Sequence, residues 1–352
     1  MINLDRAALN SPFPRAEGTI SRAMRLHRPA SNVPGQEARS AVIEWRSAIA
    51  DHLQRDHTDL SFFGSATAAV RFLADKLKGK GLVIYCSEVE HSCSRSVADT
   101  LLPVDSEGQI FGKLGGEDNV LIISAKNNET GIQPTGETRR IVSEFRDRGG
   151  ICVVDATGAD WRDPLVLEAD YIFASAGKWN GLPGMGLLAG TKGIWDNQNT
   201  EGMGGLIAGS PNTIGIACLA DAMSWISSSH GDGLKEKARN YNAAFDELAA
   251  ELGWIKNGSG DFIANYCTGI PSDLFVAAAG EHELAISAGS ACNSGFATGS
   301  HVIAAMHGDD RARCSVRFSW DRLTKETEIS QAIAIVRKID NELKALLPKG
   351  DR

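Results

Sequence analysis

Helical and strand-like patterns of apolar residues alternate along the first two thirds of this 352-residue chain. In residues 35–53 the apolar side chains recur every three or four positions, which predicts an amphipathic helix. Short, fully apolar runs then predict strands at 82–85, 120–124, 151–154 and 171–174. Helical patterns such as 138–148 separate these runs. Alternation of buried strands with helices predicts an α/β fold whose sheet is mostly parallel and covered on both faces.

The pattern changes after a helix expected at residues 234–252. Residues 313–319 alternate strictly between apolar and polar, which predicts a half-buried antiparallel strand. A last amphipathic helix is expected from 325 to 347, ended by Pro348 and Gly350.

Two domains are expected from this change of pattern. Residues 15–250 form the large domain, and residues 1–14 together with 251–352 form a smaller α+β domain. The N-terminal arm is therefore expected to pack on the second domain.

Composition narrows the class of protein. Hydrophobic residues make up 43% and charged residues 23%, with a net charge of −8, which argues against general nucleic-acid binding. The apolar runs are too short to span a bilayer and the N-terminus lacks an apolar signal segment, so we expect a cytoplasmic protein. The seven cysteines are odd in number and form no C-x-x-C pair. Neither a disulfide framework nor a metal site is therefore expected.

Two charged residues follow successive predicted strands, where ligands bind in parallel sheets. Asp155 ends the 151–154 strand and is either a turn residue or a carboxylate for a protonated pyridine nitrogen. Lys178 follows the 171–174 strand within a small-residue loop and is either a solvated lysine or a Schiff-base lysine. Together they indicate a pyridoxal-phosphate (PLP) site. A phosphate cradle is possible at residues 62–69, but by itself that segment is better explained as a plain helix start capped by Thr67.

Three further residues could do chemistry. His91 follows the 82–85 strand, and Arg317 lies on the polar face of its strand, where it could hold a carboxylate or form a surface salt bridge. Cys292 lies among Gly, Ser and Ala, in a loop that suits a nucleophilic thiol.

Over nearly its whole length the chain resembles the cysteine desulfurases, in the class V aminotransferase branch of fold-type I PLP-dependent enzymes. The most specific matches are the 287–292 segment, Ser-Ala-Gly-Ser-Ala-Cys, and the 315–319 segment, Ser-Val-Arg-Phe-Ser. Others are Gly64-Ser65-Ala66-Thr67, Glu90-His91 and Asn127-Asn128-Glu129-Thr130-Gly131. The resemblance implies that Lys178, Cys292 and His91 are catalytic. It implies cofactor contacts from Ala66, Thr67, His91, Asn128, Asp155, Ser175, Lys178 and, from a neighbouring subunit, Ser210. It implies substrate contacts from Arg317 and Asn128.

Several positions depart from the family pattern. Gly158 stands where the family usually has Gln, and Gly177 stands where it has His. Arg6 replaces an Asn, and Asp321 replaces a Gly after the carboxylate-binding strand. These departures affect groups around the cofactor, so we expect altered tuning of the site.

Three functions remain open. The leading hypothesis is a homodimeric desulfurase that converts L-cysteine to L-alanine, leaves a persulfide on Cys292 and passes sulfur to an acceptor protein. The second is a class V aminotransferase or β-lyase acting on another amino acid, which needs no thiol. The third is a PLP-binding pseudoenzyme that serves as a scaffold; retention of Lys178, His91 and Arg317 together argues against it.

Overall fold

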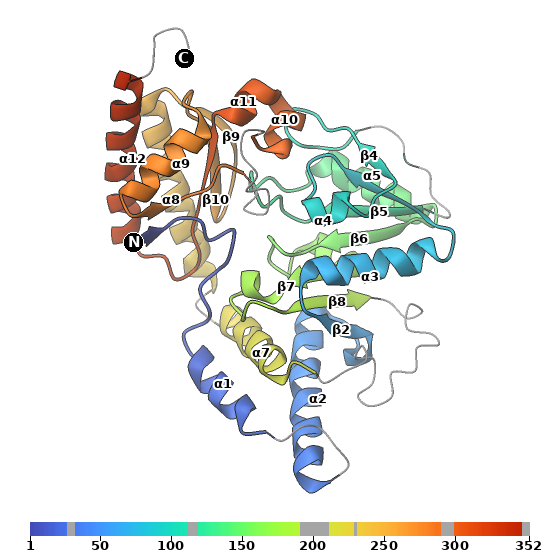
Figure 1. Ribbon diagram of the computed structural model, residues 1–352. Coiled ribbons are helices and arrows are strands. Elements are labelled where there is room, and N and C mark those ends of the chain that lie inside the picture. Colours follow the sequence, from blue (N-terminus) through green and yellow to red (C-terminus); the bar gives the residue numbers. More distant parts are fainter. Residues whose placement is uncertain are drawn as a thin grey trace.

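A seven-stranded sheet forms the centre of the larger lobe (Figure 1). The computed structural model describes residues 1–26, 32–111, 114, 119–190, 211–228, 231–289 and 299–346. In spatial order the strands are β2 (Leu60–Phe63), β8 (Gly186–Gly190), β7 (Tyr171–Ser175), β6 (Ile151–Asp155), β5 (Asn119–Ser124), β3 (Val83–Ser87) and β4 (Thr100–Leu102). Neighbours from β7 to β4 run parallel, whereas β8 is antiparallel to both β7 and β2. The predicted mostly parallel sheet is thus confirmed.

The central strands are apolar throughout because helices cover both faces of the sheet. In β5, Leu121 and Ile123 pack into one hydrophobic cluster, whereas Val120 and Ile122 pack into another on the opposite face. The first cluster includes residues of α2 (Val33–Leu53), α5 (Gly136–Asp147), α6 (Pro164–Glu168) and α7 (Thr213–Ser227). The second includes α3 (Ala66–Lys78) and Cys93 of α4 (Ser92–Arg95). The predicted helix bounds, 35–53 and 138–148, agree with those of α2 and α5 to within two residues.

The smaller lobe is built on a three-stranded antiparallel sheet. Its strands, in spatial order, are β12 (Ser315–Ser319), β10 (Ile263–Cys267) and β9 (Ile255–Gly260). Its helices are α8 (Gly231–Leu252), α9 (Ser272–Glu281), α10 (His301–His307), α11 (Asp309–Arg313) and α12 (Glu326–Leu346). Phe245 of α8 stacks on Phe318 of β12 with ring centroids 4.7 Å apart. Because α8 belongs to this second core, we propose a boundary between the lobes before residue 231 rather than at residue 250.

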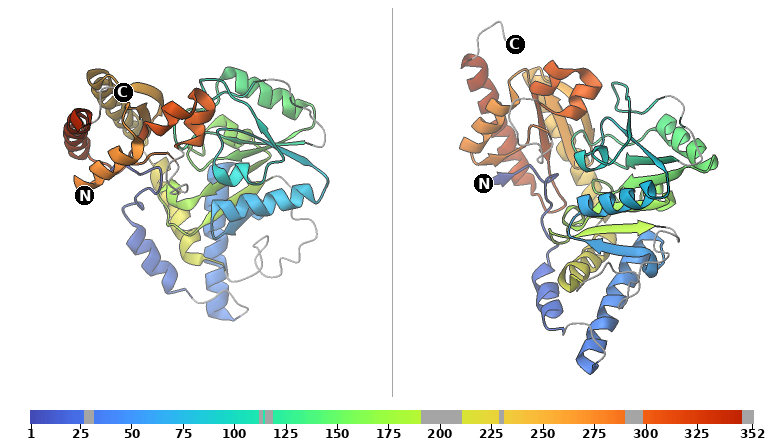
Figure 2. Two further views of the ribbon diagram at one scale, coloured as in Figure 1. Left: turned by 45° about the horizontal axis from the view of Figure 1, so that its top comes forward. Right: turned by 45° about the vertical axis from the view of Figure 1, so that its right-hand side comes forward.

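The N-terminal arm connects the two lobes (Figure 2). Strand β1 (Ile2–Asn3) pairs in parallel with β11 (Leu284–Ala285), and Leu4 is fully buried in the core of the smaller lobe. The arm then crosses to the larger lobe, where α1 (Ala16–Met24) lies against α7. No helix of the described ranges is long and apolar enough to cross a membrane.

Strand β12 is antiparallel as predicted, but the prediction that it is half-buried is wrong. All five of its residues are buried. Its polar face is covered by the N-terminal arm and by neighbouring loops, and each polar side chain there has a partner: Ser315 donates to Arg311, Arg317 pairs with Asp5, and Ser319 accepts from Ala7. The alternation of apolar and polar residues in β12 therefore distinguishes an apolar buried face from a polar buried face, and neither face is exposed to solvent.

Candidate active site

A cavity of about 200 Å³ lies where the parallel strands end. Strands β3, β5, β6 and β7 share one direction, so the loops after them meet at the same edge of the sheet. Strand β2 runs the same way, because it is antiparallel to β8, which is antiparallel to β7. The cavity lining contains eight of the predicted site residues: Ala66, Thr67, His91, Asn128, Asp155, Ser175, Lys178 and Arg317. Cys292 and Ser210 lie outside the described residues.

Asp155 is the last residue of β6 and is 6% exposed. Its Oδ1 accepts a hydrogen bond of 2.9 Å from the Thr157 main-chain N–H. Within the described ranges its Oδ2 has no hydrogen-bond partner. A buried carboxylate with one oxygen facing a cavity fits a cationic ligand atom, such as a protonated ring nitrogen.

Lys178 lies in the 3-10 turn Ala176–Trp179, which directly follows β7. Asn10 donates a hydrogen bond of 2.6 Å to the main-chain oxygen of Lys178. The neighbouring Trp179 is buried and its Nε1 donates to the main-chain oxygens of Ala156 and Ala159. The backbone that carries Lys178 is therefore fixed from both sides, and the indole N–H of Trp179 is not available to a ligand.

The loop after β2 ends at the N-terminus of α3. Ser65 is the cap of this helix, since its side chain accepts a hydrogen bond of 3.1 Å from Ala68 N, and Thr67 is not. The alternative that Thr67 caps the helix is therefore wrong, because the helix begins two residues earlier. A Cβ at Gly186 of β8 would lie 2.2 Å from the carbonyl group of Ser65, so only glycine lets the two segments approach this closely. The first N–H groups of a helix and its dipole favour an anion such as a phosphate.

His91 precedes α4, and its ring caps that helix. The His91 Nδ1 accepts from Cys93 N at 3.2 Å, which places the proton of the neutral ring on Nε2. Burial lowers the pKa of His91, although the nearby Asp155 opposes this. The neutral imidazole is thus the form that burial favours.

Two ionisable side chains of the cavity lining are not among the predicted site residues. Cys93 is a second thiol, but burial raises its pKa to about 12, so it remains protonated at neutral pH and is a poor nucleophile. Lys126 is a second lysine, 7% exposed, whose ammonium lies 5.6 Å from the ring centre of Phe262. Their positions shortly after β3 and β5 are the sequence signal that marks them.

The segment after β5 has one structural asparagine and one that lines the cavity. The Asn127 side chain donates to Val89 O at 2.7 Å and accepts from the N–H groups of Glu129 and Thr130. These bonds fold the segment so that Asn128 reaches the cavity.

Arg317 is 1% exposed and forms an ion pair of 2.6 Å with Asp5 of the N-terminal arm. Its Nη1 donates to the main-chain oxygen of Asn128 at 3.0 Å, whereas its buried Nε has no partner in the described ranges. Arg317 also lines the cavity, and a guanidinium there fits a ligand carboxylate. Asp5 was not foreseen, because it lies 312 residues from Arg317 in the sequence.

The two glycines that depart from the family pattern have different surroundings. Gly158 borders both this cavity and a neighbouring one of about 340 Å³, and a Cβ there would lie 3.0 Å from Lys126 O. At Gly177 a Cβ would lie 2.7 Å from Leu9 Cδ1, so the N-terminal arm occupies the space of the missing side chain.

Together the residues fit PLP. The lining offers an amine at Lys178, a buried carboxylate at Asp155, a helix N-terminus at Ala66 and Thr67, and a neutral ring at His91. Within the described ranges no group of three or more His, Cys, Asp or Glu side chains could hold a metal ion.

The comparisons with known proteins agree with this chemistry. The family model of aminotransferase class-V matches residues 21–331. A cysteine desulfurase of Frankia sp. is 29% identical, with 96% of this chain and 91% of that protein covered. A putative cysteine desulfurase of Bacillus subtilis is 27% identical, with 90% of each covered. A solved NifS-like protein superimposes with a TM-score of 0.85 at 22% identity, over 97% of this chain and 100% of that chain. These matches confirm the resemblance drawn from the sequence motifs.

Proposed function

We propose that this chain, which belongs to the class-V aminotransferase family, is a PLP-dependent cysteine desulfurase. It converts L-cysteine to L-alanine and transfers the sulfur to Cys292 as a persulfide. The observation that carries the proposal is one cavity in which Lys178, Asp155 and Arg317 all take part. An amine, a buried carboxylate and an arginine in one cavity suit an amino acid processed on a pyridine cofactor.

Each part of the cavity has a proposed role toward the cofactor. Lys178 would bind it covalently and Asp155 would hold its ring nitrogen protonated. Ala66, Thr67 and Ser175 would contact its phosphate, while His91 and Asn128 would contact the ring and its oxygen. When bound, PLP supplies an electron sink for the carbanion that forms at the substrate α-carbon.

The remaining steps belong to side chains of this chain. Arg317 binds the α-carboxylate of the substrate, and the amine of Lys178 accepts the α-proton. His91 takes part in moving the proton of the substrate thiol. The thiolate of Cys292 attacks the substrate sulfur: the new S–S bond forms as the Cβ–S bond breaks. The electron pair of the broken bond stays with the β-carbon, which takes up a proton and becomes the methyl group of alanine.

Two cysteine variants test this proposal with a matched control. Cys292→Ser should abolish sulfide and alanine release from L-cysteine, because serine oxygen cannot accept sulfur in this way. Cys93→Ser should retain both products, since the Cys93 thiol is buried and protonated. If Cys292→Ser forms alanine at the parent rate, the thiol is not required and an aminotransferase or β-lyase becomes the better assignment.

We propose further that the enzyme is a homodimer in which Ser210 of one subunit reaches the phosphate of the other, and that an acceptor protein takes up the sulfur. The resemblance to the family supports both assignments. Sedimentation at micromolar concentration tests the first: a monomer that retains PLP would count against it. Release of radiolabelled sulfur from Cys292 to a candidate protein tests the second.

A further inference from the structure

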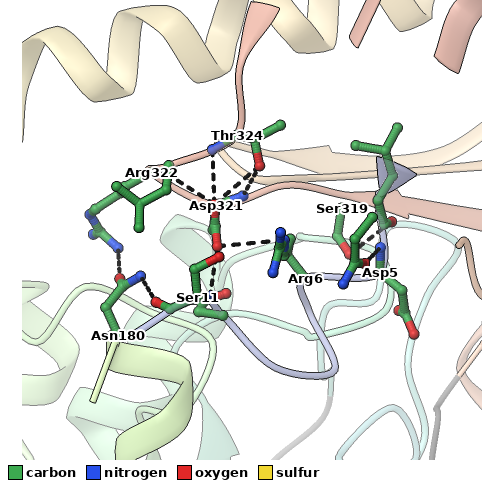
Figure 3. A network of polar contacts seen from close by, with 12 residues as sticks. Asp5, Arg6, Ser11, Asn180, Ser319, Asp321, Arg322 and Thr324 are labelled. Carbon is green, nitrogen blue, oxygen red and sulfur yellow. Dashed lines mark hydrogen bonds and ion pairs between the residues drawn. The ribbon is translucent and has the colours of Figure 1, made fainter. Parts of the chain in front are cut away.

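Residues 5–13 of the N-terminal arm form a strap that touches both β12 and the Lys178 turn. At the β12 end, Arg6 N donates to Ser319 O at 3.3 Å and Ala7 N donates to Ser319 Oγ at 2.8 Å. Asp5, at the start of the strap, forms the 2.6 Å ion pair with Arg317. Figure 3 shows this end of the strap beside Ser319.

At its other end the strap is bound to the turn that carries Lys178. Asn10 donates to Lys178 O at 2.6 Å, and Asn180 Nδ2 donates to Ser11 O at 2.7 Å. Phe13 N donates to Asn180 O at 2.8 Å. The strap therefore links the arginine proposed for the substrate carboxylate to the backbone of the proposed cofactor lysine.

The fully buried side chain of Asp321 holds the middle of the strap with one of its two oxygens (Figure 3). Its Oδ1 accepts from Leu323 N, Thr324 N and Thr324 Oγ1, at 2.9, 3.0 and 3.1 Å, and so stabilises the turn after β12. Its Oδ2 accepts from Ser11 N at 2.8 Å and lies 3.6 Å from Arg6 Nε. One oxygen thus serves the local turn and the other serves the strap.

We propose that Asp321 is a positioning residue: through Ser11 and Arg6 it holds the strap so that Asp5 orients Arg317 toward the substrate carboxylate. This role of Asp321 rests on the role proposed above for Arg317. A long guanidinium side chain has many rotamers, and a buried one is fixed by the groups that its N–H donors meet. Asp5 engages Nη2 and Asn128 O engages Nη1, so these two contacts fix the guanidinium where Arg317 lines the cavity. The position of Asp5 in turn depends on the strap.

The pair Arg6 and Asp321 gives the inference a second support. Both residues depart from the family pattern noted in the sequence, and the structure brings them together as an ion pair. The buried carboxylate of Asp321 accepts four hydrogen bonds, from Ser11, Leu323 and Thr324, and all four would remain without Arg6. The ion pair with Arg6 therefore matters more for the position of the strap than for the stability of the buried Asp321 carboxylate.

Asp321→Asn removes only the strap contact. The asparagine oxygen can still accept at the Oδ1 position, whereas its NH₂ group cannot accept from Ser11 N. We expect KM for L-cysteine to rise about tenfold, as expected for the loss of one hydrogen bond to a charged group, with kcat within twofold of the parent. Hydrogen exchange of the peptide 5–13 should become faster. Thr324→Val is the matched control: it removes a hydroxyl from the Oδ1 side, so thermal stability should fall while KM and exchange of the strap stay unchanged.

The outcomes separate this inference from the proposed function. If Asp321→Asn accelerates strap exchange but leaves KM unchanged, while Arg317→Lys raises KM, the strap does not position Arg317 and the inference is wrong. If Arg317→Lys also leaves KM unchanged, the role of Arg317 in the proposed function fails. Equal KM increases in Asp321→Asn and Thr324→Val would show a general loss of stability and would also overturn the inference. Calorimetric titration with L-cysteine supplies the same comparison as dissociation constants.

Discussion

The Ser300 hydroxyl donates a hydrogen bond of 2.5 Å to the buried carboxylate of Glu129. A Cβ at Gly289 would lie 3.2 Å from Oε2 of the same carboxylate, and Gly289 has a φ of +119°, which favours glycine. Gly289 and Ser300 flank the segment that carries Cys292. The two residues that flank it therefore lie at one side chain, Glu129, which follows the cavity residue Asn128.

Ser300→Ala should lower the free energy of unfolding by about 1.5–3 kcal/mol, because the buried Glu129 carboxylate loses the hydrogen bond that the Ser300 hydroxyl donates. Ser300 also caps α10 by accepting from Ile303 N, so part of the loss belongs to the cap. Ser300→Thr keeps the hydroxyl and should cost much less. Urea unfolding of the two variants measures the difference. Equal losses in both variants would contradict the prediction, because keeping the hydroxyl would then not protect the fold.

Glu90 is expected to make stability depend on pH. Its side chain is buried and accepts from Ser87 and Ser124, and burial raises its pKa from 4.5 to about 7. Between these two values the folded protein binds a proton that the unfolded chain has lost. This group therefore stabilises the fold fully below pH 4.5, and the contribution is lost as pH rises to 7.

Glu90→Gln should remove that dependence. The difference in unfolding free energy between the variant and the parent should shift in favour of the variant from pH 4.5 to pH 8, on the order of 3 kcal/mol at most. Chemical unfolding at several pH values gives this difference and cancels the contributions of other carboxylates. A difference that is constant with pH would mean that Glu90 does not titrate in this window.

Gly177→His is expected to fail as a single change and to be rescued by Leu9→Ala. The strap side chain Leu9 lies 2.7 Å from the position of the added Cβ, and it is 43% exposed, so it can be shortened without opening the core. The double variant should retain PLP more tightly than Leu9→Ala alone, because an imidazole can add a hydrogen bond. Equilibrium dialysis of PLP compares them. At Gly158 the nearest atom is the backbone oxygen of Lys126, so Gly158→Gln should be tolerated less well.

From the sequence, residues at the ends of the parallel strands were predicted to lie close together. Asp155 and Lys178 were placed near each other because parallel strands end at one edge, and the structure brings both to one cavity. Contacts across the two lobes were not predictable in this way. The Asp5–Arg317 pair depends on how the arm folds back over β12, and no local period encodes that contact. The same covering of β12 explains why alternation was mistaken for exposure.

Two lysines line the same cavity, and the proposed function requires that only Lys178 binds the cofactor covalently. Lys178 follows β7, beside the β6 strand that ends at Asp155, so its amine and the carboxylate come from neighbouring strands. Lys126 instead follows β5, and its ammonium lies over the Phe262 ring of the smaller lobe. Borohydride reduction followed by peptide mapping should therefore find PLP on Lys178 alone. Lys178→Ala should abolish the adduct, whereas Lys126→Met should keep it. An adduct on Lys126 in the parent protein, or an adduct that survives in Lys178→Ala, would show that the cofactor is bound in a different orientation in this cavity.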